Sequence, residues 1–190
     1  MGIDFQIYIE ARVISSFLLL LLILTKEKGH RKREEDNMDL EELFDKKTPG
    51  EYDLKWSLRK NGYEVKDVSG NPDYWGKDID LIATNTSTNI TTTIEVKWDN
   101  RISATGNIFI ELENPRSKGC MGWFNFCEAD LLAYGDSNNR IFYFIRLADL
   151  RQFIKEHKLD LNCRTTGDGS YGYLLPLAIV EDLFECVVKV

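Results

Sequence analysis

Three charged side chains, Asp80, Glu95 and Lys97, have types and spacing suited to chemistry on a phosphate ester. Side chains alternate between the two faces of a strand, so Glu95 and Lys97 project from one face of their predicted strand and Val96 from the other. The connection over residues 85–92 is short and rich in Thr and Asn, which predicts a hairpin. We therefore expect the Asp80 carboxylate to lie close to Glu95 and Lys97.

Two carboxylates and one ammonium group match the needs of a metal-dependent phosphodiesterase. Mg²⁺ prefers oxygen ligands and keeps several waters, so one or two carboxylates and a substrate phosphate complete its coordination. The ion polarises the phosphoryl oxygen and lowers the pKa of a bound water, while a nearby ammonium offsets the charge that develops on the phosphate. The residues therefore predict a nuclease that uses Mg²⁺ or Mn²⁺.

The histidine content excludes several other hydrolytic mechanisms. The 190 residues contain two histidines, His30 and His157. Hydrolases that activate a serine or cysteine through a charge relay need a histidine base, and His-rich zinc sites need several imidazoles. His30 lies in a charged run and His157 near the end of a predicted helix, so neither is expected to serve such a site.

The segments around the three charged residues resemble the PD-(D/E)XK nuclease superfamily. Residues 76–83 (GKDIDLIA) are similar to its aspartate strand, and residues 94–97 (IEVK) are similar to its Glu-x-Lys strand. The resemblance extends over about Glu51–Leu147. It implies a restriction-endonuclease-like α/β fold, in which a mixed central sheet of about four strands is flanked by helices, and it implies hydrolysis of DNA.

The resemblance also implies roles for individual residues. Asp80 and Glu95 would bind the metal ion, Lys97 would position or activate the attacking water, and Glu51 on the preceding helix would support the metal shell. The later segments are similar to a phage and mobile-element branch of the superfamily; they cover residues 105–113, 122–124 and 129–134.

Other acidic residues compete for these roles. Asp73 also precedes Glu95 in a Pro-Asp pair, but it lies in a predicted turn, so Asp80 is preferred. Asp78 shares a face of the predicted strand with Asp80 and is a further candidate metal ligand, and Glu111 could face the same cleft. The alternative without function is that the Glu-x-Lys pair is a surface ion pair, which contributes about 0–1 kcal/mol.

Hydrophobic periodicity predicts the elements that position these groups. Leu54 and Leu58 at spacing i, i+4, with Gly62 as the stop, predict an amphipathic helix over residues 51–61. The order of elements predicts a mixed α/β layer fold. Strands are predicted over residues 63–68, 78–83, 93–98, 108–112, 141–145 and 173–177. Further helices are predicted over residues 123–134, 148–157 and 180–186.

The first 37 residues differ in texture from the rest of the chain. Residues 13–24 are mostly apolar and precede a charged run. This pattern predicts either a short membrane anchor or a mis-assigned start upstream of a true start at Met38. A nuclease-like domain over residues 38–190 is expected in both cases. The four cysteines form no CxxC pair, so we expect reduced, mostly buried thiols in a cytoplasmic protein.

The formal net charge of −7 bears on the expected partner, which is DNA, with RNA left open. Polyphosphate binding usually needs a basic face, so weak and salt-sensitive affinity is expected unless Arg101, Arg116 and Lys118 cluster. The aromatic cluster 123–126 could stack on bases, although such spacing is more often a core pattern. The alternative function is a nuclease-fold module without turnover that binds nucleic acid or a protein, and a homodimer is left open.

Overall fold

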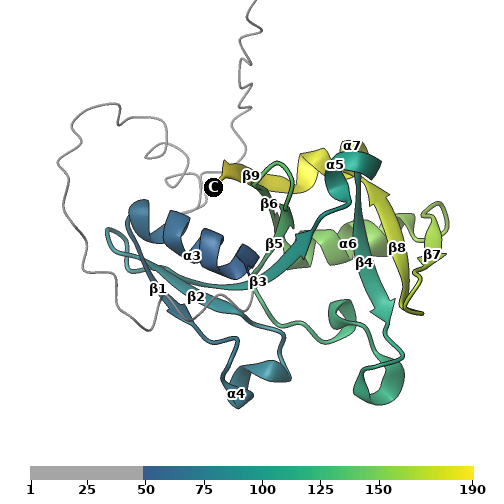
Figure 1. The fold of residues 1–190 in the computed structure, drawn as a ribbon, viewed down its shortest axis with the longest axis horizontal. Coiled ribbons are helices and arrows are strands. Elements are labelled where there is room, and N and C mark those ends of the chain that lie inside the picture. Colours follow the sequence, from purple (N-terminus) through teal and green to yellow (C-terminus); the bar gives the residue numbers. More distant parts are fainter. Residues whose placement is uncertain (1–48) are drawn as a thin grey trace, which may run out of the picture. The chain divides into compact units, whose positions relative to one another are not determined.

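The computed structural model describes residues 49–190 (Figure 1). The apolar run 13–24 and the predicted domain boundary between residues 37 and 38 lie outside the described residues. The described chain forms a six-stranded sheet in the order β1-β2-β3-β5-β6-β9 and a three-stranded sheet in the order β4-β8-β7. The predicted fold class, an α/β fold with a mixed central sheet flanked by helices, is confirmed, with six strands in that sheet.

Most predicted elements agree with the structure to within a few residues, including the helices that correspond to α3 and α6. The strands are β1 (Tyr63–Asp67), β2 (Leu81–Asn85), β3 (Thr91–Asp99), β4 (Asn107–Glu113), β5 (Leu131–Asp136), β6 (Ile141–Arg146), β7 (Cys163–Thr165), β8 (Tyr171–Pro176) and β9 (Phe184–Lys189). The α-helices are α3 (Pro49–Lys60), α4 (Pro72–Trp75), α5 (Ile102–Thr105), α6 (Leu147–His157) and α7 (Leu177–Val180). The 3₁₀ helices are η1 (Lys118–Cys120), η2 (Trp123–Asn125) and η3 (Glu181–Leu183).

The large sheet joins two antiparallel groups of strands through one parallel pair. β1, β2 and β3 are antiparallel neighbours, as the short hairpin over residues 85–92 predicts. β3 then pairs in parallel with β5, with Glu95 opposite Leu132 and Lys97 opposite Tyr134. β5, β6 and β9 complete the sheet in antiparallel order. The Glu-x-Lys strand β3 therefore lies inside the sheet, with a neighbour on each side.

Helix α3 covers one face of this sheet and lies across β1, β2 and β3 (Figure 1). Leu54 and Leu58 are buried beneath it, as their spacing predicts. The Trp98 side chain fills the space between the helix and β5, because glycines lie on both sides of it. A Cβ atom at Gly50 would lie 2.7 Å from the Trp98 side chain, and one at Gly135 would lie 2.1 Å from its ring. These close approaches hold Trp98, and with it β3, against the rest of the sheet.

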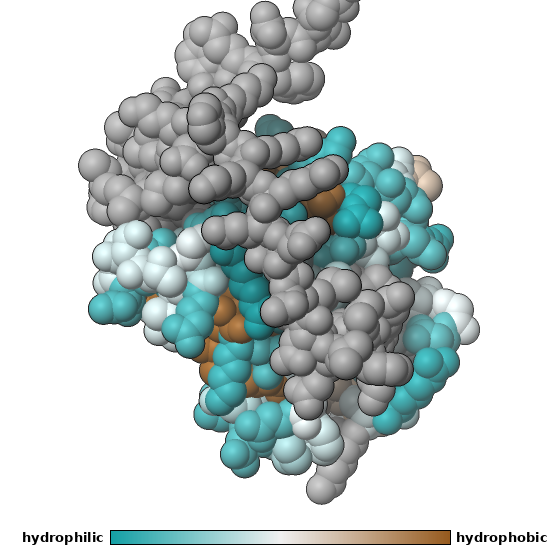
Figure 2. All heavy atoms as spheres, turned by 60° about the vertical axis from the view of Figure 1, so that its left-hand side comes forward, coloured by the Kyte–Doolittle hydropathy of each residue, from teal (hydrophilic) through white to brown (hydrophobic). Residues whose placement is uncertain are grey.

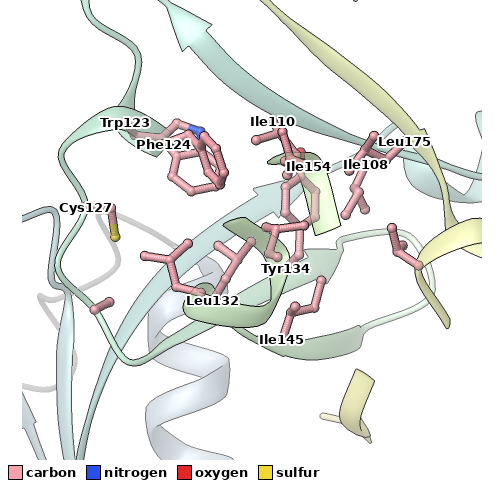
Figure 3. Close-up of a cluster of buried hydrophobic side chains, with 14 of the residues drawn as sticks. Ile108, Ile110, Trp123, Phe124, Cys127, Leu132, Tyr134, Ile145, Ile154 and Leu175 are labelled. Atoms are coloured by element: carbon pink, nitrogen blue, oxygen red, sulfur yellow. The ribbon is translucent and has the colours of Figure 1, made fainter. Parts of the chain in front are cut away.

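The opposite face of the sheet packs against the three-stranded sheet and α6. Leu132 and Ile145 from the large sheet meet Ile108 and Ile110 from β4, and all four are fully buried (Figure 3). Ile154 adds the apolar side of α6 to the same cluster. Burial of this kind contributes about 25 cal/mol per Å² of apolar surface, so the cluster holds the two sheets in a defined relation. Glu95 and Lys97 project from this face.

Two predicted helices are wrong. The predicted helix over residues 123–134 is the short η2 followed by β5, whose six residues are all buried. A continuous apolar run fits a central strand as well as a helix, and only the pairing of β5 with β3 and β6 decides between them. The predicted helix over residues 180–186 is helical only as far as the end of η3 at Leu183. The residues from Phe184 onward form β9, because they pair with β6.

Smaller predictions also change. The strand expected from residue 78 begins at Leu81, and Asp78 precedes it with a left-handed φ of 50°. All four cysteines are free, as expected, but only Cys127 and Cys186 are buried. On the face shown in Figure 2, the atoms that are not grey are mainly those of hydrophilic and neutral residues, with a hydrophobic patch between them. No helix in residues 49–190 is long and apolar enough to cross a membrane.

Candidate active site

Asp80 is tied to β3 through its backbone and through its side chain. It lies directly before β2, and its backbone N–H donates to the Ile94 carbonyl at 3.0 Å. Its Oδ2 accepts a hydrogen bond from the Val96 backbone N–H at 2.9 Å. The carboxylate is thereby held beside the Glu95 position, as the predicted hairpin requires.

Glu95 and Lys97 form an ion pair at the centre of the site. The Glu95 side chain is 2% exposed, and its Oε1 accepts a hydrogen bond from Lys97 Nζ. Lys97 Nζ also donates to Asp78 Oδ2 at 3.2 Å and lies 5.1 Å from the centre of the Trp123 ring, a cation–π contact. The other Glu95 oxygen, Oε2, is buried and accepts no hydrogen bond from residues 49–190. The Asp80 carboxyl lies within hydrogen-bonding reach of Glu95, so the two buried carboxyls share one site in which Oε2 receives no N–H donor from the described residues.

Burial dominates the electrostatics of the two carboxylates. It raises the pKa of Glu95 well above the ordinary 4.5, although the Lys97 charge opposes the change. Burial also raises the pKa of Asp80, against the hydrogen bond from Val96, which lowers it. Burial lowers the pKa of Lys97, but the carboxylates of Glu95 and Asp78 outweigh it and keep that pKa above its usual value. Lys97 therefore stays protonated, and the carboxyl groups of Glu95 and Asp80 bind their protons more tightly than exposed carboxyl groups do.

A cleft of about 810 Å³ opens above this cluster. Lys97 and Asp78 line it, while Glu95 lies almost fully buried beside Lys97 Nζ. The three-stranded sheet supplies another part of the lining, including Asn107, Phe109 and Glu111 of β4. Lys97 thus lies between the open cleft and the buried carboxylate.

The structure gathers most of the predicted acidic residues. Asp78 joins the site from the turn before β2, through its contact with Lys97. Glu111 lines the same cleft, where both of its carboxylate oxygens accept from the Asn114 amide at 3.3 Å. Asp73 is exposed on α4, so the choice of Asp80 in its place agrees with the contact to β3.

Glu51 lies away from the Glu95 face of the sheet. It is half-buried in the first turn of α3, next to the Gly50 that packs on the Trp98 side chain. Trp98 leaves β3 on the face opposite Glu95 and Lys97, because neighbouring strand residues alternate. The supporting role that the resemblance implies for Glu51 stays a prediction.

The predicted basic residues do not form one cluster. Arg101 lines the cleft, but Arg116 pairs with Asp168 at 3.7 Å across two loops near it. The placement of the Lys118 side chain lies outside the described part of the chain. Arg164, which sequence reasoning missed, joins Arg101 in the lining. Nothing in the local pattern around Arg164 indicates this position, because it depends on the pairing of β7 with β8.

Two further residues of the site were missed, although one had a signal. Asp99 lines the cleft and continues the alternation of Glu95 and Lys97, so the strand pattern could have indicated it. The Tyr134 hydroxyl lies 3.5 Å from Asp99 Oδ2 and 3.2 Å from the Phe109 carbonyl oxygen, and this position needs the parallel pairing of β3 with β5.

The residues fit a hard cation, although in residues 49–190 no three Asp, Glu, His or Cys side chains are arranged to hold a metal ion as they stand. The orphaned Glu95 Oε2 and the adjacent Asp80 carboxylate are oxygen donors of the kind that Mg²⁺ takes one or two of. Cys127 is no competing soft ligand, because burial raises its pKa to about 12 and its thiol lies near the Asp78 carbonyl oxygen at 3.3 Å.

Comparison with known proteins finds similarity among solved structures. No protein-family model matches the chain, and no curated protein has a significantly similar sequence. Among solved structures, a bacterial homing endonuclease, I-Ssp6803I, is similar at a TM-score of 0.39 and 15% sequence identity. The alignment covers 67% of this chain and 70% of that chain.

Proposed function

We propose that the protein is a metal-dependent nuclease that hydrolyses phosphodiester bonds in DNA, with Mg²⁺ or Mn²⁺ as its metal. The observation that carries the proposal is the Glu95 carboxylate, which is buried beside Lys97 and has one oxygen without a hydrogen bond. A buried charge persists in proteins when it is paired or binds a metal ion. This carboxylate lies next to a cleft that has room for a polar ligand.

Each residue of the cluster has a role in this proposal. Asp80 and Glu95 would hold the metal ion, with Asp78 as a further ligand. A bound divalent ion would polarise the phosphoryl oxygen and lower the pKa of a coordinated water.

Lys97 is the residue of this group best placed to act on the substrate. Its ammonium borders the cleft, where it can orient the attacking water and offset the negative charge that builds up on the phosphate oxygens. In the hydrolysis, the water oxygen forms a bond to phosphorus while the bond from phosphorus to the leaving sugar oxygen breaks. The water gives up one proton, and the leaving oxygen takes one. No histidine is needed in this scheme.

A cleavage assay with the purified full chain tests the proposal. We expect cleavage of plasmid, single-stranded or branched DNA in Mg²⁺ or Mn²⁺, and none after removal of the metal with EDTA. Products from all three DNAs are read on gels, and substitution of Asp80 by Asn serves as the inactive reference. Binding of DNA without any product in either metal would instead support the module without turnover, and cleavage that continues in EDTA would contradict metal dependence.

We expect cleavage to increase with pH in the neutral to alkaline range. Burial raises the pKa of Glu95 above 4.5 and that of Asp80 above 3.8, so protons compete with the metal ion over a range that extends upward from these values. The apparent affinity for Mg²⁺, measured from the rate against metal concentration, should rise up to about tenfold per pH unit where one proton is displaced. An affinity that stays constant between about pH 6 and pH 9 would contradict these carboxylates as the ligands.

A further inference from the structure

The strand β4 presents different side chains to the core and to the cleft. Ile108 and Ile110 are 0% exposed and belong to the core between the two sheets. Asn107, Phe109 and Glu111, on the alternate positions, line the cleft. An aromatic ring is thus placed between an amide and a carboxylate, in a cleft that the candidate active site shares.

Of the aromatic rings that line the cleft, Phe109 is the one most available to a ligand. Phe126 also lines the cleft but packs against the core cluster, and the Trp123 ring already lies against the Lys97 ammonium. Of the other two aromatic residues in the lining, Trp98 stacks on Phe142 with ring centres 4.8 Å apart, and Tyr134 is buried. Phe109 is half-buried and, in the described part of the chain, does not belong to the side chains packed on that cluster. Met121, which is 49% exposed, adds a flexible apolar side chain to the same lining.

The backbone at Phe109 is held near Lys97. Tyr134, the partner of Lys97 in the β3–β5 pair, places its hydroxyl 3.2 Å from the Phe109 carbonyl oxygen and 3.1 Å from its backbone nitrogen. A base lying on the Phe109 ring would therefore have its own backbone within the same cleft as the Lys97 ammonium. The relation is set by two paired strands and a buried tyrosine, so it does not depend on a loop.

The size and charge of the cleft favour a single strand. Pockets that enclose a small ligand have about 300–1,000 Å³, so a cleft of about 810 Å³ has the size to enclose a base with its sugar and phosphate, whereas paired strands would have to lie across its mouth. Two exposed cations, Arg101 and Arg164, line the cleft as well and can meet phosphates. Cations beside an aromatic platform are the combination that single-strand binding proteins use.

We propose that the cleft binds an unpaired DNA strand, with one base stacked on Phe109 and the flanking phosphates beside Arg101 and Arg164. The proposal rests on the proposed nuclease function, because the same strand carries the phosphate that Lys97 would act on. It specifies the substrate class as single-stranded DNA or DNA with an unpaired segment. A fully paired, blunt duplex would be a poor ligand.

Fluorescence anisotropy of labelled DNA in EDTA tests this proposal apart from catalysis. The probes are a single strand of about 15 nucleotides, within the site sizes of single-strand binders, and a blunt duplex of the same sequence at the same salt concentration. We expect the full chain to bind the single strand at least about tenfold more tightly. Phe109→Leu, which keeps an apolar side chain but removes the ring, should weaken single-strand binding by about 5- to 150-fold, the contribution of one stacked base.

Phe153→Leu is the matched control, because Phe153 is also a half-buried phenylalanine but stacks on His157 in α6, outside the cleft lining. It should leave single-strand binding unchanged, and circular dichroism checks that both variants are folded. Equal or tighter binding of the duplex would overturn the proposal, as would equal effects of the two substitutions. Metal-dependent cleavage with no preference for unpaired DNA would leave the nuclease function standing without this substrate class, whereas single-strand binding with no cleavage would contradict the nuclease function alone.

Discussion

Glu95→Gln is expected to lower the rate of metal-dependent DNA cleavage by about 10²- to 10⁴-fold, the usual effect of removing a group that acts directly on the reaction. The amide keeps the shape of the side chain but has no negative charge for a metal ion. It also removes a carboxyl group that is 2% exposed and whose Oε2 has no hydrogen-bond partner among the described residues. Lys97 is 28% exposed and keeps its 3.2 Å contact with Asp78, and the cost of burying the Glu95 charge is removed, so the variant should be at least as stable as the wild type.

The opposite directions of the two effects make this variant informative. A residue retained only for packing or for an ion pair would not lose activity while keeping stability. Glu64→Gln is the matched control, because it makes the same chemical change at an exposed position of β1. Initial rates in saturating Mg²⁺ and chemical denaturation of both variants give the comparison. Cleavage at the wild-type rate in the Glu95→Gln protein would exclude Glu95 as a metal ligand.

At alkaline pH, where Glu95 is ionised, Lys97→Met is expected to lower the free energy of unfolding by about 2–3 kcal/mol, because it leaves the Glu95 carboxylate buried without its ammonium. Removal of one partner from a fully buried pair costs about 3–5 kcal/mol, and the Lys97 side chain is 28% exposed, so a smaller loss is expected. Methionine keeps most of the length of the side chain and its contact with the Trp123 ring. The change therefore isolates the charge.

A double-mutant cycle measures this coupling. The variant that combines Lys97→Met with Glu95→Gln has neither charge and should recover most of the lost stability, so the two single effects should not add. Additive effects in chemical denaturation would show that Lys97 does not neutralise Glu95. Cleavage should be lost in both the single and the double variant, which separates the catalytic need for the pair from its effect on stability.

The loss of stability in Lys97→Met should depend on pH. In the wild type, burial already raises the folded-state pKa of Glu95 to about 10 although Lys97 lowers it, so removal of the ammonium raises that pKa further. Below the wild-type folded-state pKa, the Glu95 carboxyl is protonated in both folded proteins, so the loss should be small. The loss should grow as the pH rises above that value, because the wild type then gains an ion pair that the variant lacks. A loss of the same size at neutral and alkaline pH would mean that it arises from packing.

Local spacing was enough to find the centre of the site. The alternation of a strand puts Glu95 and Lys97 on one face, and a short hairpin brings Asp80 beside them. The three residues lie within about twenty positions of one another, so local rules were enough to predict that they converge. The same local rules found α3 through the spacing of Leu54 and Leu58. They failed for β5, because an apolar run that is buried on both faces has no periodicity that separates a strand from a helix.

The chemical types at the site and the strands next to them thus follow from local sequence patterns. The cleft does not, because its lining comes from the parallel pairing of β3 with β5 and from the pairing of β4 with β8, which begins more than fifty residues after β4 ends. The tertiary structure also brings Asp78 to Lys97 from a turn and Phe109 near them. Local periodicity carries no information on which distant strands become neighbours, since burial of the shared core decides that pairing.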